Sequence, residues 1–162
     1  MGSMSSTSRF ELPSFPTSKV DLVKRYRFYS DLAGFLRAVA RLDDTFDSFI
    51  TGSPFAEGRL IRARRDVSVK VYDARAGRFV RLQEITHALD EDERCADLEV
   101  ALSYSYLNER YDRVPLEGDV FLVRASIEGD VLTLKICLEQ GVGRTEGGML
   151  AHMIVDALRR YL

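Results

Sequence analysis

The sequence contains few residues of the types that bind metals or act as nucleophiles in pairs. There are two histidines, His87 and His152, and two cysteines, Cys95 and Cys137. Neither histidine lies in a paired arrangement such as HExxH, and the cysteines lack metal-type spacing. A Cys–His nucleophile pair could form only by approach in space, and nothing in the sequence supports one. We therefore predict buried free thiols in a reducing compartment, no metal or cofactor, and no catalytic residue.

A glycine-rich stretch, GVGRTEGG at residues 141–148, raises the possibility of phosphate binding. It lacks the GxxxxGK[ST] pattern and is not a GxGxxG after the first strand of a βαβ unit. Its glycines with Arg144 and Thr145 could still bind an anion at the start of the following helix. A plain strand-to-helix loop is the simpler interpretation. The acidic cluster at 43–47 lacks the spacing and glycine of an EF-hand.

Arginines form one local basic cluster. Arg59, Arg62, Arg64 and Arg65 lie within seven positions of the sequence, RLIRARR. We predict that they form a patch that binds an anion or an acidic protein partner. The formal net charge of the chain is -2, so no overall positive field favours nucleic acid. Nucleic acid is therefore not the expected partner.

The composition is that of one globular domain. The 162 residues are 46% hydrophobic and 30% charged, which is near the average for soluble proteins. We predict a disordered tail over 1–17, in which MGSM resembles an expression tag, and a single α+β domain over 18–162. There is no apolar run long enough to span a membrane and no secretory signal, so a cytoplasmic location is expected.

Helical spacing of apolar residues predicts a helix at each end of the domain. At the N-terminal end a helix is expected to start at Ser18, with a second possible start at Ser30. The segment DDTFDSFI is interpreted as its last turn. At the C-terminal end Thr145 is the expected N-cap, and the apolar positions repeat with helical period. They are Leu150, Met153, Ile154, Ala157, Leu158 and Tyr161.

Two hairpins are predicted between these helices. The segments DVSVKVYD and RFVRLQEI alternate apolar and polar residues around the breaker RAG. The segments GDVFLVRASI and DVLTLKICLE flank EGD, where Gly129 supplies the positive φ of a tight turn.

The segment between the hairpins, residues 91–107, fits two structures. Its acidic start and its good helix formers favour a helix, whereas SYSY and a step-of-two apolar pattern favour a strand. We predict the helix, which gives the order α-β-β-α-β-β-α with an antiparallel sheet of about five strands. A strand here would instead resemble a pleckstrin-homology or polo-box arrangement.

The helical version resembles the type III secretion chaperone-like fold, including the YbjN-type family. Over residues 95–162 the matching features are Leu107-Asn108 at a turn, the acidic-glycine turn at 128–130, and the glycine loop before the last helix. The resemblance implies a non-catalytic, chaperone-like or adaptor domain that binds another protein as a homodimer. The alternatives are a pleckstrin-homology or polo-box-like interaction module and a small-molecule-binding α+β domain.

Overall fold

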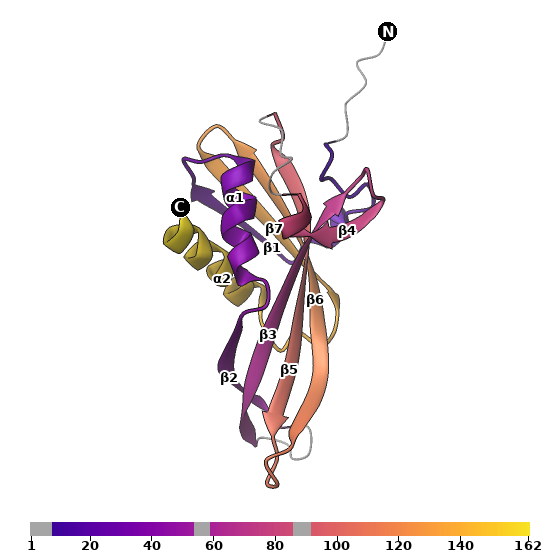
Figure 1. Cartoon of the computed structure of the whole chain (residues 1–162), viewed down its shortest axis with the longest axis vertical. Coiled ribbons are helices and arrows are strands. Elements are labelled where there is room, and N and C mark those ends of the chain that lie inside the picture. The colour runs from indigo at the N-terminus through magenta and orange to yellow at the C-terminus, as the bar shows by residue number, and fades with distance from the viewer. Residues whose placement is uncertain (1–7, 54–58, 86–91) are drawn as a thin grey trace.

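A long, twisted antiparallel sheet carries two helices on one face of its upper part (Figure 1). The computed structural model describes residues 8–53, 59–85 and 92–162. Three short 3₁₀ turns accompany the main elements, at Thr17–Lys19, Ala40–Leu42 and Leu82–Glu84. The helices and strands, in chain order, are β1 (Leu22–Arg27), α1 (Leu32–Val39), β2 (Phe46–Gly52), β3 (Leu60–Asp73), β4 (Arg78–Arg81), β5 (Cys95–Leu107), β6 (Arg113–Glu128), β7 (Val131–Gln140) and α2 (Gly147–Tyr161).

The strand order within the sheet is β1-β7-β6-β5-β3-β2, and every pair in it is antiparallel. The short β4 adds to the end of β3 and lies off this path. The first strand, β1, therefore pairs with the last strand, β7, and forms one edge of the sheet. β2 forms the opposite edge. The lower halves of β2, β3, β5 and β6 extend beyond the helices as a narrow projection (Figure 1).

The predicted fold class, with about five strands in the order α-β-β-α-β-β-α, is wrong. The main error is the segment 91–107: from Cys95 onward it is the strand β5, in the middle of the sheet. Every second residue of β5 faces the core, and Val100 lies between Val69 of β3 and Phe121 of β6. Two apolar neighbouring strands make the step-of-two pattern decisive, and local helix propensity is too weak to oppose that burial.

The helix predicted from Ser18 is also wrong. Residues 22–27 form β1, in which Leu22 lies opposite Ile136. Only the second start is confirmed, because α1 begins after residue 30; its cap is Asp31, whose carboxylate accepts the Gly34 N–H at 2.8 Å. The segment interpreted as a last helical turn instead contributes β2.

Both hairpins and the C-terminal helix are confirmed. β3 and β4 pair around a turn in which Gly77 has φ 67°, and β6 and β7 pair around Gly129 with φ 60°. Glycine adopts this left-handed conformation without the steric cost that a Cβ brings. The expected N-cap of α2 is shifted by one residue, because Glu146 occupies that position and Thr145 turns inward.

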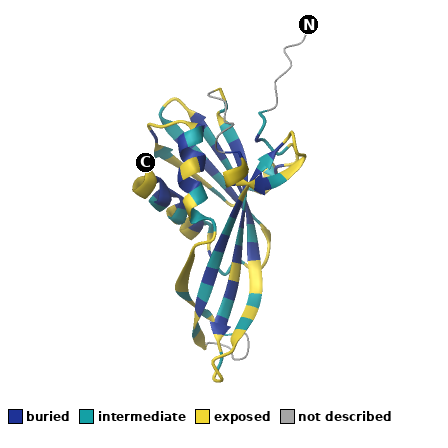
Figure 2. Cartoon of the chain, in the orientation of Figure 1, coloured by how far each residue is buried: buried dark blue, intermediate teal, exposed yellow. Residues whose placement is uncertain are grey.

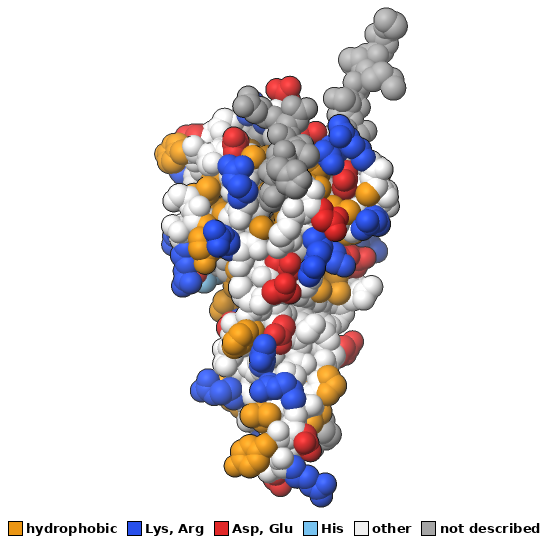
Figure 3. Space-filling view, viewed as in Figure 1, with side chains coloured by type: hydrophobic (Ala, Val, Ile, Leu, Met, Phe, Trp, Pro, Cys, Tyr) orange, Lys and Arg blue, Asp and Glu red, His pale blue; other side chains and the backbone are white. Residues whose placement is uncertain are grey.

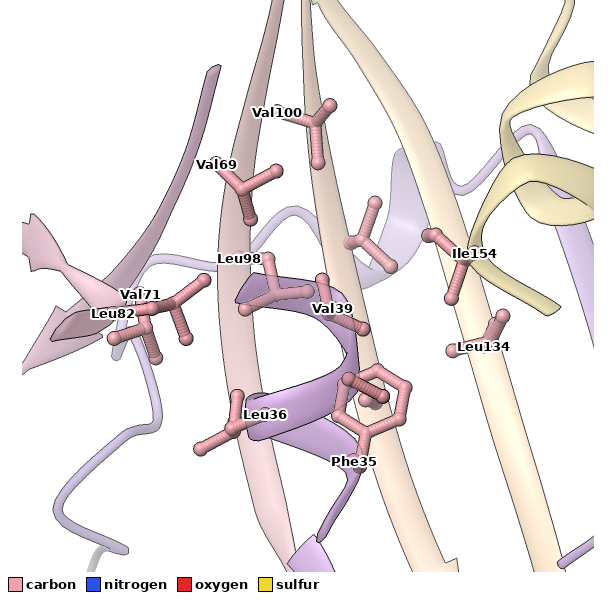
Figure 4. Packing of buried hydrophobic residues seen from close by; sticks show 14 of the residues in the cluster. Phe35, Leu36, Val39, Val69, Val71, Leu82, Leu98, Val100, Leu134 and Ile154 are labelled. Atoms are coloured by element: carbon pink, nitrogen blue, oxygen red, sulfur yellow. The ribbon is translucent and has the colours of Figure 1, made fainter. Parts of the chain in front are cut away.

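The core lies between the helices and the sheet face that they cover, called here the inner face. Phe35, Leu36 and Val39 of α1 point toward Leu98 and its neighbours on the sheet, as Figure 4 shows. From α2, Ile154 packs beside Leu134 of β7. Along β3, buried positions alternate mainly with half-buried ones (Figure 2). The helices therefore pack against only one half of the sheet, and they do not cover the projection.

The described part of the predicted tail, residues 8–17, packs against the sheet. Phe10 is completely buried, and its carbonyl accepts the Asp97 N–H at 2.8 Å. The Asp97 carboxylate, on the outer face, pairs with Arg124 at 2.8 Å. The Phe15 ring lies under that guanidinium, with 4.4 Å between Arg124 Cζ and the ring centroid. This segment covers part of the outer face that the helices leave open.

Candidate functional site: the edge strand β2

Within the described residues, β2 pairs with another strand along only one of its two edges. Hydrogen bonds at both ends of its pairing with β3 set the pattern: Ser53 N–H donates to the Arg59 carbonyl, and Val67 N–H donates to the Thr45 carbonyl. In an antiparallel ladder, bonded residues alternate with residues whose N–H and C=O point away. The outward-pointing groups of β2 therefore belong to Phe46, Ser48, Ile50 and Gly52. No other described segment pairs with this edge.

Large apolar side chains accompany these free backbone groups on the outer face. Phe46 is 63% exposed, Ile50 57% and Leu60 of the neighbouring strand 68%. We call the β2 edge with these three side chains the β2 surface. β2 lies at the margin of the projection in Figure 1, and most of it is exposed in Figure 2. Figure 3 shows hydrophobic side chains interspersed with Lys and Arg over the projection.

The opposite edge of the same sheet, β1, has a different character. Three of its six residues, Lys24, Arg25 and Arg27, are cationic. Charged side chains on an edge strand, lysine above all, oppose pairing with another chain. The sequence of β2, FDSFITG, contains neither lysine, arginine nor proline. The one charged residue of β2, Asp47, is paired with Arg65 of β3, so the β2 edge carries less protection against strand addition than the β1 edge.

A buried polar cluster beneath β2 determines its position. Arg65 of β3 is 5% exposed, and its Nε donates to Asp47 Oδ1 of β2 at 2.9 Å. Its NH1 donates to Thr145 Oγ1 at 2.8 Å, in the loop before α2. The Phe49 ring of β2 lies under the guanidinium and 5.3 Å from the ring of Tyr104. The edge strand is thus held from inside by an ion pair and two ring contacts.

The second half of the cluster surrounds Asp119, which is 1% exposed. Tyr104 Oη donates to Asp119 Oδ2 at 2.6 Å and lies 2.9 Å from Thr145 Oγ1. Burial raises the pKa of Tyr104 above its ordinary value, and the hydrogen bond to Asp119 raises it further. The phenol stays protonated and acts as a donor. The arrangement joins the sheet to the loop at 141–146 and supplies no exposed nucleophile.

The predicted arginine patch is divided by strand alternation. Arg65 points inward into the cluster, whereas Arg62 and Arg64 lie on the outer face. Arg64 pairs with Asp66 at 3.0 Å, and its Cζ stacks 3.9 Å above the ring of Phe46. Arg59 is exposed near the tip of the projection, beside Tyr106. Arg62 and Arg64 therefore border the β2 surface, and Arg65 supports it from below.

The remaining candidate residues, which are the histidines, the cysteines and the glycine-rich loop, do not form a common site in the described part of the chain. His152 is exposed on α2, and His87 lies outside the described residues. Both cysteines are free, and Cys137 is buried. In the glycine-rich loop, Gly143 N–H donates to Asp119 Oδ1 at 2.8 Å, so a carboxylate of the chain itself takes an amide that an external anion would need. Within 8–53, 59–85 and 92–162, no group of three His, Cys, Asp or Glu could hold a metal ion.

Reasoning from the sequence missed the β2 surface and the cluster. The segment FDSFIT does not alternate apolar and polar residues, and its aromatic and β-branched residues were the only local signal for a strand. Tyr104 lies 15 residues before Asp119 in the sequence, and Thr145 lies 26 residues after it. No local motif therefore contains all three.

No protein-family model, curated protein or solved structure matches the chain. In the described part of the chain, no helix is both long and apolar enough to cross a membrane.

Proposed function

We propose that this chain is a non-catalytic, protein-binding domain that forms a homodimer through β2. The observation that carries the proposal is the less protected edge, whose free N–H and C=O groups lie beside exposed Phe46 and Ile50. Strand addition to a sheet edge is a recurrent mode of protein recognition, in which backbone hydrogen bonds supply affinity and alternate side chains supply specificity.

The β2 sequence is complementary to itself in the antiparallel direction. With Ser48 on a two-fold axis, the outward-facing backbone groups of Phe46 pair with those of Ile50 in the second copy. The same register places a phenyl ring opposite a β-branched side chain on the outer face, a favourable cross-strand pair. On the inner face, Asp47 lies opposite Phe49 of the second copy, so no like charges oppose each other. Such an interface is isologous and closes as a dimer.

A proline at position 48 tests the pairing directly. The Ser48 N–H points away from β3, so Ser48→Pro removes a donor from the edge and leaves the ladder within the chain intact. We expect the wild-type protein to sediment as a dimer and Ser48→Pro as a monomer with an unchanged circular dichroism spectrum. Ile50→Lys adds a charge to the same edge and is expected to weaken the dimer in the same direction.

Leu107→Lys is the matched control. Leu107 is an exposed apolar residue on the outer face of β5, away from the edge, at 51% exposure. It should leave the dimer unchanged. A wild-type protein that remains monomeric at all accessible concentrations contradicts the proposal, as does a dimer that survives both Ser48→Pro and Ile50→Lys.

The wider role as a chaperone-like or adaptor domain rests on the same capacity to bind proteins. Supporting it, the polar side chains of the cluster are buried and hydrogen-bonded to one another, so they are not available to a substrate. The resemblance to secretion chaperones stays a prediction. The helix that shaped it is the strand β5.

A further inference from the structure

An apolar groove lies between the last turns of α2 and the end of β1. At its start α2 lies close to the sheet, because a Cβ on Gly147 would meet Leu22 and Ile136 at ordinary contact distance. Toward its C-terminal end the helix borders a groove of about 580 Å³. This volume lies within the range of about 300–1,000 Å³ that is typical of small-molecule sites. The groove is at the opposite edge of the sheet from the β2 surface.

The lining of the groove is largely apolar, and its charged side chains are two arginines. Leu132 and Leu158 are among the buried residues that line it, and Arg27 and Arg159 are its charged lining residues. No acidic side chain is among the lining residues. Besides the two arginines, the lining comprises Tyr26, Phe28, Tyr29, Ser30, Leu132, Val155, Leu158 and Leu162.

Three carboxylates that lie close in sequence to lining residues, those of Asp31, Asp130 and Asp156, already have partners. Asp130 pairs with Arg27, and the Asp31 carboxylate accepts the Gly34 N–H at the start of α1. Arg159 is exposed, and it has no carboxylate partner within the described ranges, whereas its neighbour Arg160 pairs with Asp156 at 3.2 Å. The rim thus has one cation available for an external anion.

We propose that this groove binds a single-chain amphiphile with an anionic headgroup. The alkyl chain lies on the apolar floor, and the headgroup pairs with Arg159 at the rim. Burial of each methylene contributes about 0.8 kcal/mol, so the chain supplies most of the affinity. The arginine supplies the preference for a negative headgroup, because an ion pair at an exposed rim adds only a modest amount.

Three probes that share one alkyl chain test the two parts of the proposal separately. Decanoate, decanol and decyltrimethylammonium, each below its micelle concentration, are titrated into the wild-type protein by calorimetry. We expect decanoate to bind saturably and more tightly than decanol, and decyltrimethylammonium to bind most weakly. Equal affinity for all three, or no saturable binding of decanoate, overturns the proposal.

Paired variants locate the site. Arg159→Glu reverses the charge at the rim and should weaken decanoate binding by about tenfold, while decanol binding is unchanged. Arg160→Glu makes the same change of charge in the same helical turn, but Arg160 does not line the groove. It should alter decanoate affinity by less than about twofold.

A third variant fills the groove. Val155 lines it and is 9% exposed, so Val155→Phe should reduce decanoate binding at least about tenfold by occupying the floor. Circular dichroism and the urea midpoint verify that each variant is folded. Unchanged decanoate affinity in a folded Val155→Phe variant, or equal loss in Arg159→Glu and Arg160→Glu, contradicts the assignment. Because β2 is not involved, the Ser48→Pro monomer should bind decanoate like the wild type.

Discussion

At the scale of single residues, the buried carboxylate of Asp119 is stabilised by hydrogen bonds from three other residues. Its carboxylate is almost fully buried and accepts hydrogen bonds from the Tyr104 hydroxyl at 2.6 Å, the Gly143 N–H at 2.8 Å and the Thr145 N–H at 3.4 Å. A buried charge without donors is costly, so each donor contributes to the stability of the fold. The cluster is therefore a structural centre of the molecule.

We expect Tyr104→Phe to lower the free energy of unfolding by about 1–3 kcal/mol, because the change removes a donor to a buried carboxylate. Urea denaturation measures the difference. Tyr72→Phe is the matched control: Tyr72 is half-buried and packs its ring 5.6 Å from that of Phe79. It should change stability by less than about 0.5 kcal/mol. Equal effects of the two variants would show that the Tyr104 hydroxyl is not a structural donor.

Because the pKa of the Cys95 thiol is raised, we predict that the free energy of unfolding falls at alkaline pH. Burial, together with the charges of Asp97 and Glu11, raises the pKa of Cys95 from its ordinary value of 9.0 to about 12. A raised folded-state pKa stabilises the fold fully below the unfolded value and progressively less as the pH rises toward 12. Cys95 therefore contributes a loss of at most about 1.4 kcal/mol per pH unit above pH 9.

The measurement is urea denaturation of the wild type and Cys95→Ala between pH 7 and pH 10.5. We expect the free energy of unfolding to fall less steeply with pH in Cys95→Ala. The slope is the readout, since truncation of the side chain shifts stability at every pH. Parallel curves would contradict a raised thiol pKa.

At the scale of elements, the loop before α2 is shaped by a close approach to β6. Gly141 has φ 103°, and a Cβ there would overlap both Asp119 Oδ1 and the Gly118 carbonyl oxygen. Gly118 itself lies at the β-bulge of β6, where a Cβ would be 2.8 Å from the Leu102 carbonyl oxygen. The loop can reach the buried carboxylate only because both positions lack a side chain.

Two glycine substitutions should therefore have opposite signs. We expect Gly141→Ala to lower the free energy of unfolding by more than about 2 kcal/mol through backbone strain and overlap. Gly148→Ala, in the first turn of α2, meets open space and should raise it by up to about 1 kcal/mol through better helix propensity. Urea denaturation of both variants measures the pair. Destabilisation of similar size by both would contradict this account of the loop.

At the scale of the whole molecule, the sheet extends beyond the helices, and its two edges differ. The β1 edge carries cations, and the β2 edge offers backbone groups and exposed apolar side chains. Pairing of β2 with a second copy would join two sheets into one continuous sheet. The amphiphile groove lies at the other edge, so the two proposed activities are separable in space.

Dimerisation through β2 makes thermal stability depend on protein concentration. Mass action favours the folded dimer at higher concentration, so Tm of the wild type should rise with concentration. We expect Tm of Ser48→Pro to be independent of concentration, because the monomer unfolds without dissociation. Differential scanning calorimetry over a hundredfold range of concentration measures both. The same concentration dependence in both proteins would contradict pairing at β2.

Local patterns were sufficient for both hairpins and for α2. Gly129 marks a turn that needs positive φ, and the apolar positions from Leu150 to Leu158 repeat with helical period. Each of these signals lies within one short segment, where the turn geometry or the exposed and buried faces follow from neighbouring residues. The C-terminal helix that closes the sheet followed from the same signals.

Only the tertiary structure decided that residues 95–107 form a strand and that Thr145 faces inward. The apolar residues of this segment fit both the spacing of an amphipathic helix and the alternation of a strand. Burial between β3 and β6 favours the strand. Thr145 has the chemistry of an N-cap, but its hydroxyl contacts Arg65 and Tyr104 from distant strands. The sequence by itself determined which segments could be apolar elements. Their partners across the sheet determined the topology, the buried cluster and the exposed edge, because pairing and burial act between residues far apart in the chain.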